Sequence, residues 1–166
     1  ILAGGQSLMP LMNMRMIRPK VVIDINHLTT LDYIKDSSEN ALEIGALTRQ
    51  STIERSSLVS NKNPLLAHVM PYIGHFQIRN RGTIGGSIVH ADPAAELPAI
   101  TVLLNAEFTL ENASTARTVK AGDFFVNYLE TDADSTEILT KIRIPDWPSG
   151  WGWGFEEVYR RSGDFA

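Results

Sequence analysis

The sequence predicts an α+β fold, because strand-like and helix-like segments are mixed along the chain without steady β–α alternation. Short β-branched or alternating apolar runs are typical of strands, and apolar residues at three- and four-residue spacing are typical of helices. The chain has 166 residues, of which 43% are apolar, so it can bury a sizeable core. This length fits one domain or two small lobes.

The first third of the chain is predicted to contain several short strands and two helices. Apolar residues at positions 8, 11, 12 and 16 share one face of a helix, and Ser7 is a residue type that caps such a helix. The polar stretch 36–40 between two apolar runs predicts a hairpin. In order, we expect the end of a strand at 1–3, a helix over 8–14, strands at 21–25, 31–35 and 42–44, and a helix that Thr48 caps and that runs to about Arg55.

The rest of the chain is predicted to mix helices, strands and one long irregular segment. The polar, turn-rich segment 56–64 predicts a boundary between two lobes. Segment 79–95 is dense in Gly, Asn, Asp and Pro, and an irregular segment of this length inside a compact domain is usually functional. The other expected elements are helices over 65–73 and 97–104, strands at 107–110, 118–120, 137–144 and 155–160, a packed turn at 123–125 and a linker at 147–154.

Composition excludes several classes of function. The net charge is −4 and no basic run or basic–aromatic stripe occurs, which argues against a nucleic-acid partner. The absence of cysteine excludes disulfides, a thiolate nucleophile and a cysteine-held iron–sulfur cluster within this sequence. No apolar run reaches the length of a bilayer, and no signal peptide is recognised. These features fit a reducing compartment, and we expect the cytoplasm.

Two glycine segments about 80 residues apart are the strongest local signal. Adjacent glycines allow a left-handed backbone and the close approach of a ligand, and consecutive N–H groups can then surround an anion. Two such segments suggest two contacts to one ligand that carries two phosphates. Each alone can also be an ordinary turn, with Arg79 or Arg81 in an ion pair beside the second. The first segment is Ala3-Gly4-Gly5-Gln6-Ser7, and the second is Thr83-Ile84-Gly85-Gly86-Ser87 after Arg79-Asn80-Arg81-Gly82.

A histidine and two carboxylates lie close together at 90–96 and invite an acid–base or a metal interpretation. The spacing of His90 and Asp92 in a proline-terminated turn does not favour a metal site, so we predict none. The alternative is that Asp92 caps the turn and Glu96 places charge at a helix N-terminus. We favour a hydrogen bond to a ligand hydroxyl, and we assign no catalytic residue.

Five motifs, in this order along the chain, resemble those of one family. They are Ala3-Gly4-Gly5-Gln6-Ser7, the stretch 79–86, Ala91-Asp92-Pro93-Ala94-Ala95-Glu96, Asp123-Phe124-Phe125 and the terminal 161–166. Over essentially the whole chain, the sequence resembles the FAD-binding medium subunit of molybdenum hydroxylases. That family includes the flavoprotein subunit of aerobic carbon monoxide dehydrogenase and the flavin domain of xanthine dehydrogenase.

The resemblance implies a two-lobed FAD-binding domain of the vanillyl-alcohol-oxidase (PCMH) type, truncated at both ends. We expect a first lobe at 1–56 with its N-terminal part missing, and a second lobe at 57–146. Segment 147–166 would be a linker and the start of a C-terminal α+β domain.

The resemblance also implies roles for individual residues. Glu96 would hydrogen-bond the hydroxyl region of FAD, and Phe165, after Asp164, would lie over the isoalloxazine ring. The residues expected to hold the FAD pyrophosphate are Ala3, Gly4, Gly5, Gln6, Ser7, Thr83, Ile84, Gly85, Gly86 and Ser87.

The implied function is electron transfer within a hetero-oligomer. A large subunit with the molybdenum cofactor would hydroxylate the substrate, and a small subunit would pass electrons through two [2Fe–2S] clusters to the FAD. The acceptor would be NAD⁺, oxygen or a quinone. The lack of cysteine agrees, since the clusters would lie on another chain. Two alternatives stay open: a non-catalytic scaffold that docks the molybdenum subunit, and a stand-alone flavin oxidase.

Overall fold

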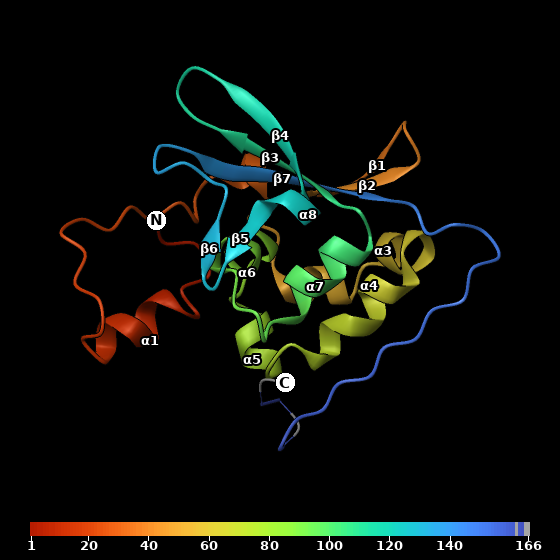
Figure 1. Ribbon diagram of the computed structural model, residues 1–166, viewed down its shortest axis with the longest axis horizontal. Coiled ribbons are helices and arrows are strands. Elements are labelled where there is room, and N and C mark those ends of the chain that lie inside the picture. The colour runs from red at the N-terminus through yellow and green to blue at the C-terminus, as the bar shows by residue number, and fades with distance from the viewer. Residues whose placement is uncertain (162, 165–166) are drawn as a thin grey trace.

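A five-stranded antiparallel sheet organises the molecule, which the computed structural model describes over residues 1–161 and 163–164 (Figure 1). Its strands lie in the order β1-β2-β7-β3-β4, and β5 and β6 form a separate hairpin. The strands and helices do not alternate, so the α+β prediction is confirmed. The bounds are β1 (Ile34–Ser37), β2 (Ala41–Gly45), β3 (Glu107–Glu111), β4 (Ala116–Lys120), β5 (Phe125–Asn127), β6 (Glu130–Thr131) and β7 (Ile138–Pro145).

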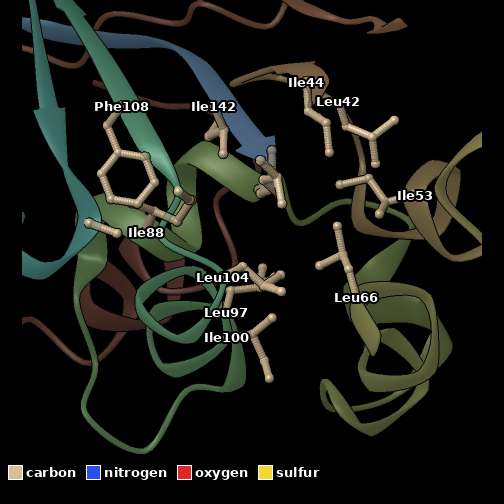
Figure 2. Close-up of a cluster of buried hydrophobic side chains, with 14 of the residues drawn as sticks. Leu42, Ile44, Ile53, Leu66, Ile88, Leu97, Ile100, Leu104, Phe108 and Ile142 are labelled. Carbon is tan, nitrogen blue, oxygen red and sulfur yellow. The ribbon is translucent and has the colours of Figure 1, made fainter. Parts of the chain in front are cut away.

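Strand β7 lies at the centre of the sheet, and its apolar residues match those of both neighbours. Ile142 is the register partner of Ile44 on β2 and of Phe108 on β3. Ile144 is the partner of Leu42. Since side chains alternate across a strand, these residues share one face of the sheet. All five are fully buried, and the four of them that Figure 2 labels, Leu42, Ile44, Phe108 and Ile142, form the upper part of the core in that view.

Short helices cover this apolar face. Leu66 from α4, Ile88 from α6 and Leu97 from α7 extend from the helices toward the sheet residues in Figure 2. Within the described chain, no helix combines the length and the apolar composition needed to cross a membrane. The bounds are α1 (Leu8–Asn13), η1 (Thr29–Leu31), α2 (Gln50–Glu54), α3 (Ser57–Lys62), α4 (Pro64–Val69), η2 (Met70–Tyr72), α5 (Phe76–Arg79), α6 (Ile84–His90), α7 (Glu96–Leu103) and α8 (Ala121–Phe124).

Segment 56–64, which was predicted to be a turn, forms helix α3 and the start of α4. The Ser56 hydroxyl accepts a hydrogen bond from the Val59 N–H at 3.3 Å, and the Asn63 side chain accepts one from the Leu66 N–H at 3.1 Å. Both are N-caps, so the polar residues that suggested a turn begin helices instead.

One sheet and one core extend across residue 57, where the sequence analysis places the lobe boundary. Strands β1 and β2 precede this residue and β3, β4 and β7 follow it, yet β2 pairs directly with β7. Leu42 and Ile44 also belong to the same apolar cluster as Phe108 and Ile142. The lobe boundary stays a prediction, and a division at this point would cross hydrogen-bonded strands.

The N-terminal segment pairs with itself through a single parallel bridge. The Leu2 N–H donates to the Ile23 carbonyl at 2.7 Å, and the Ile25 N–H donates to the Leu2 carbonyl at 3.0 Å. The strands predicted at 1–3 and 21–25 are therefore reduced to this bridge. Helix α1 is confirmed and lies apart from the sheet in Figure 1. Ser7 is the N-cap residue of α1, as predicted, but its side chain makes no capping hydrogen bond.

Thr48 does not cap α2, contrary to the prediction. Its hydroxyl donates to the Tyr33 carbonyl at 2.9 Å and accepts from the Tyr33 N–H at 3.1 Å. Thr48 therefore joins the chain before β1 to the chain after β2, and Arg49 is the N-cap residue of α2. The strand expected at 31–35 begins only at Ile34, because Leu31 ends the short helix η1.

The chain after β7 runs past α3 and α4 without regular structure among its described residues (Figure 1). The strand predicted at 155–160 is therefore wrong. Aromatic contacts position this segment instead: the Trp153 ring lies 4.8 Å from the His68 ring, and the Phe155 ring lies 5.0 Å from that of Tyr72. Rings at these separations pack favourably without any strand pairing.

The packed turn predicted at 123–125 is a short helix followed by a strand. Phe124 ends α8 and is fully buried, and its ring meets the Phe108 ring edge-on at 4.9 Å. Phe125 then begins β5. The packing prediction is correct and the turn prediction is not, because four residues of helix separate β4 from β5.

Candidate functional site

One cavity of about 450 Å³ gathers almost all the predicted binding residues. This volume lies within the usual range of ligand sites. Ile84 does not line it, because that side chain is fully buried in the core. Phe165 lies outside the described residues, so its predicted place over a ring stays a prediction. The predicted residues that line the cavity are Ala3, Gly4, Gly5, Gln6, Ser7, Thr83, Gly85, Gly86, Ser87, Glu96 and Asp164.

The first glycine segment has backbone N–H groups that no described residue accepts. From residue 3 to residue 7, none of these groups donates a hydrogen bond to an acceptor within the described chain. Gly5 has a φ of +73°, in the left-handed region that favours glycine, and its carbonyl accepts from the Met9 N–H at 3.1 Å. Unpaired N–H groups at the wall of a cavity can donate to a bound anion.

The second glycine segment is the first turn of helix α6, which corrects the prediction of an irregular segment at 79–95. Thr83 is its N-cap residue. The N–H groups of residues 84–87 are bonded at 2.9–3.2 Å to the carbonyls of Thr48, Ala46 and Thr83 and to the Thr83 hydroxyl. This segment therefore offers the Thr83 and Ser87 hydroxyls to a ligand, and its backbone donors are already used.

The two glycine segments are in direct contact. A Cβ at Gly4 would lie 2.5 Å from the Arg81 carbonyl oxygen and 2.8 Å from the Gly82 Cα, so only glycine permits this approach. A Cβ at Gly85 would lie 2.6 Å from the Ala46 Cβ, which explains how α6 packs closely against the chain after β2. Gly86 is exposed, and a Cβ there would meet only the Thr83 hydroxyl, at 2.8 Å. Gly86 therefore lines the cavity with no protein group except the Thr83 hydroxyl close to its Cβ position.

Arg49 joins the two segments from outside the cavity, a role that the sequence analysis missed. One of its terminal nitrogens donates to the carbonyl of Arg81, and the other donates to the Asn26 Oδ1 at 2.6 Å. The Asn26 Nδ2 in turn donates to the Ala3 carbonyl at 2.8 Å. Burial, and then the nearby charge of Arg81, lower the pKa of Arg49. No local motif signals this connection, because its members come from four separate parts of the chain.

Arg79 is bonded to protein groups, in agreement with the ion pair that is one of the interpretations given above. Its Nε donates to the Glu54 carboxylate at 2.7 Å. Its Nη1 donates to the carbonyls of Pro71, Ile73 and Gly74 at 3.1–3.3 Å. Ile73 and Gly74 line the cavity. Arg79 therefore shapes the wall of the cavity, and its partner is a carboxylate.

Glu96 begins α7 and lines the cavity with only 9% of its surface exposed. Burial raises the pKa of its carboxyl group, because the charged form is poorly solvated there. The Asp92 carboxylate accepts a hydrogen bond from the Ala94 N–H at 2.9 Å. Asp92 therefore caps the turn, as the alternative interpretation of this segment predicts. Among the described residues, no group of His, Asp and Glu is arranged to hold a metal ion.

Asp164 reaches the cavity at the far end of the described chain. Its N–H donates to the Arg161 carbonyl at 2.9 Å. A Cβ at the neighbouring Gly163 would lie 2.5 Å from the His75 Cε1, so this part of the chain lies directly on His75. Residues before α5 and near the C-terminus therefore meet at one wall of the cavity.

Another wall comes from the segment between β6 and β7, which the sequence analysis did not single out. Ala133 and Glu137 line the cavity there. Arg117 on β4 holds this segment with hydrogen bonds to the Asp132 carboxylate at 2.5 Å and the Glu137 carboxylate at 2.7 Å. The hydrogen bond from Arg117 is the main cause that lowers the pKa of Glu137 to about 2. Only the sheet topology brings these residues beside the glycine segments.

Comparisons with known proteins agree over nearly the whole chain. A family described as "FAD binding domain in molybdopterin dehydrogenase" matches residues 1–147. The glyceraldehyde dehydrogenase medium chain of Sulfolobus acidocaldarius is 44% identical, over 99% of this chain and 58% of its own length. The carbon monoxide dehydrogenase medium chain of Hydrogenophaga pseudoflava is 39% identical, over 100% of this chain and 58% of its own length.

Solved structures give the same result. The structure of carbon monoxide dehydrogenase from Hydrogenophaga pseudoflava contains a chain that superimposes with a TM-score of 0.96 at 39% identity, over 99% of this chain and 57% of that one. The structure of quinoline 2-oxidoreductase from Pseudomonas putida 86 contains a chain that superimposes with a TM-score of 0.94 at 35% identity, over 99% of this chain and 57% of that one. The chain thus spans a little over half the length of the relatives it matches.

Proposed function

The chain belongs to the family of FAD-binding domains in molybdopterin dehydrogenases, and we propose that it is the FAD-binding part of an electron-transfer subunit in a molybdenum hydroxylase. Electrons would come from the [2Fe–2S] clusters of a small subunit and leave to NAD⁺, oxygen or a quinone. A large subunit would carry the molybdenum cofactor. Two relatives are named medium chains, which supports an assembly of several different chains.

The observation that carries this proposal is the set of unpaired N–H groups at residues 3–7, at the wall of a cavity that both glycine segments line. A pyrophosphate needs hydrogen-bond donors and a close approach to the backbone, and this wall supplies both. A Cβ at Gly86 would lie 2.8 Å from the Thr83 hydroxyl, which lines the cavity, and a Cβ at Gly5 would lie 3.1 Å from the side chains of Leu2 and Met9. The residues present therefore fit FAD.

Each part of the site has a proposed task toward FAD. Backbone N–H groups of residues 3–7 would hold the pyrophosphate, and the hydroxyls of Thr83 and Ser87 would add hydrogen bonds from the start of α6. Glu96 would bond a hydroxyl group of the cofactor, and Asp164 would bring the following Phe165 toward the flavin ring. FAD, when bound, supplies the redox chemistry, and the protein supplies binding and orientation. We assign no catalytic residue.

The wider organisation follows the same proposal. We propose that residues 1–56 and 57–146 contribute to two FAD-binding lobes, and that residues 147–166 lead into a C-terminal domain. The cytoplasm is the proposed location, since the partner clusters and the absence of cysteine fit a reducing compartment.

Visible absorption of the purified full-length subunit, supplied with FAD and then freed of unbound cofactor, tests the proposal. We expect a flavin band at close to one FAD per chain. A spectrum of the full-length subunit without this band would mean that the assignment of the cofactor is wrong and that a scaffold role is favoured.

A second measurement separates electron transfer from a stand-alone oxidase. The flavin-loaded subunit is mixed with small oxidisable substrates in the absence of other subunits, and its absorbance is followed. We expect no change until the partner subunits are added. Bleaching by a small substrate alone would overturn the electron-transfer role and favour a direct oxidase.

A further inference from the structure

Gln50 has a buried side-chain amide without a partner in the described chain. The residue is only 4% exposed, and its Oε1 is buried and accepts no hydrogen bond there. Its Nε2 donates to no described acceptor, and the residue lines the cavity. Buried amides in folded proteins normally have hydrogen-bond partners, so an exception at a cavity wall points to a ligand.

The amide lies where the two glycine segments meet. The Gln50 N–H donates to the Gly82 carbonyl at 3.0 Å, and a Cβ at Gly82 would lie 2.6 Å from the Gln50 Oε1. Gly82 also touches Gly4. The amide of Gln50 is therefore in contact with the residue that joins the first segment to the second.

We propose that Gln50 binds the ligand directly, by donating its side-chain N–H to a phosphate oxygen at the junction of the two glycine segments. This inference rests on the proposed function. The segment 84–87 has no unpaired backbone N–H, so it cannot match the donors of residues 3–7. Gln50 supplies the missing donor beside Gly82. The Gln50 Nε2 makes no hydrogen bond within the described chain and, unlike the Oε1, is not fully buried, so it can donate to a ligand in the cavity.

The test is FAD binding by the full-length subunit and two variants, Gln50→Leu and Gln50→Glu, followed by quenching of flavin fluorescence. Riboflavin, which has no phosphate, is the second probe. We expect Gln50→Leu to weaken FAD binding about tenfold, since a hydrogen bond to a charged group is lost. Gln50→Glu should weaken it further, because a carboxylate would face the phosphate. Riboflavin binding should change by less than threefold in both variants.

Gln77→Leu is the matched control, because Gln77 is exposed on α5 and does not line the cavity. Its FAD affinity should equal that of the wild type. Thermal unfolding without FAD gives a second readout: Gln50→Leu should unfold at the same or a higher temperature, since it removes an unpaired polar group.

Three outcomes would overturn the inference. The first is unchanged FAD affinity in Gln50→Leu, and the second is wild-type affinity in Gln50→Glu. The third is a loss of FAD and riboflavin binding together with a lower unfolding temperature, which would make Gln50 a structural residue. A wild-type subunit that fails to bind FAD would instead overturn the proposed function itself.

Discussion

The two glycine segments look alike in the sequence and use their backbones in opposite ways. In residues 3–7 the N–H groups are unpaired within the described chain, and Gly5 adopts a left-handed conformation. In residues 84–87 every N–H is bonded to a protein acceptor, and the glycines lie in a helix. A glycine pair therefore indicates that another group, from a ligand or from the protein, closely approaches the backbone. The hydrogen-bond pattern decides whether that partner is a ligand or the protein itself.

The difference follows from what each segment packs against. Gly85 lies directly on Ala46, so the second segment is part of the core of the fold. The first segment is half-buried and touches the second through Gly4. We infer that the second segment builds the platform and that the first segment, resting on it, does most of the anion binding.

Valine at Gly5 should have the largest effect on FAD binding. A β-branched residue at φ +73° is strained, and its Cβ would lie 3.1 Å from the side chains of Leu2 and Met9. Strain of about 1–3 kcal/mol, released only by moving the segment, predicts a loss of affinity of about 10- to 100-fold. Fluorescence titration with FAD measures it.

Gly152→Val is the control for Gly5→Val, since a Cβ at Gly152 meets nothing within 4 Å. It should bind FAD as the wild type does. Equal affinities of Gly5→Val and Gly152→Val would show that the conformation of the first segment is not needed for binding.

Alanine at Gly85 should act on the fold instead. Its Cβ would lie 2.6 Å from the Ala46 Cβ and 2.7 Å from the Ala46 carbonyl oxygen, and backbone atoms cannot easily move away. Overpacking of this kind costs about 1–3 kcal/mol. Urea unfolding without FAD should show this loss in Gly85→Ala, and a smaller loss in Gly86→Ala, whose Cβ meets only the Thr83 hydroxyl. Equal losses of unfolding free energy in Gly85→Ala and Gly86→Ala would contradict the different roles given to these two glycines.

Alanine at Arg49 should loosen the contact between the segments. Arg49 bonds Arg81 and Asn26, and Asn26 bonds Ala3, so either substitution breaks the same connection. We expect a several-fold loss of FAD affinity in Arg49→Ala and in Asn26→Ala. The double variant should lose little more than either single one, with a coupling of about 1 kcal/mol. Strictly additive losses in this double-mutant cycle would argue against a shared connection.

Glutamine at Glu96 should give the smallest effect, visible mainly as a pH dependence. Burial raises the pKa of Glu96 in the folded chain, so the folded state holds a proton that the unfolded state releases. Its contribution to stability is therefore present at low pH and is lost as the pH rises from the ordinary value of 4.5 through the raised pKa. In urea unfolding without FAD, the free energy of unfolding of Glu96→Gln should increase relative to that of the wild type as the pH rises over that range. A constant difference would contradict the raised pKa.

Much of the sheet could be predicted from local pattern, and the site only in part. Strands such as Glu107–Glu111 and Ile138–Pro145 alternate buried and less buried residues, a pattern that is visible in the sequence. The caps at Ser56 and Asn63 were mistaken for a turn, because the same residue types favour both. The glycines of α6 concealed a helix for a different reason, since the contact between Gly85 and Ala46 is not local.

The connections that hold the site could not be predicted from motifs. Arg49, Asn26 and Ala3 are far apart in the sequence, and their hydrogen bonds exist only once the chain is folded. Gln50 is an ordinary helix residue in the sequence, and its burial follows from the position of Gly82. In this fold the glycine motifs line the cavity, and distant residues shape its walls.

Amide hydrogen exchange of the full-length subunit, with and without FAD, tests the comparison most directly. The amides of residues 3–7 should exchange quickly without FAD and become protected when it is bound, since the ligand is their acceptor. The amides of residues 84–87 should be protected in both states, because their acceptors belong to the protein. New protection confined to residues 84–87, with none at 3–7, would contradict the account.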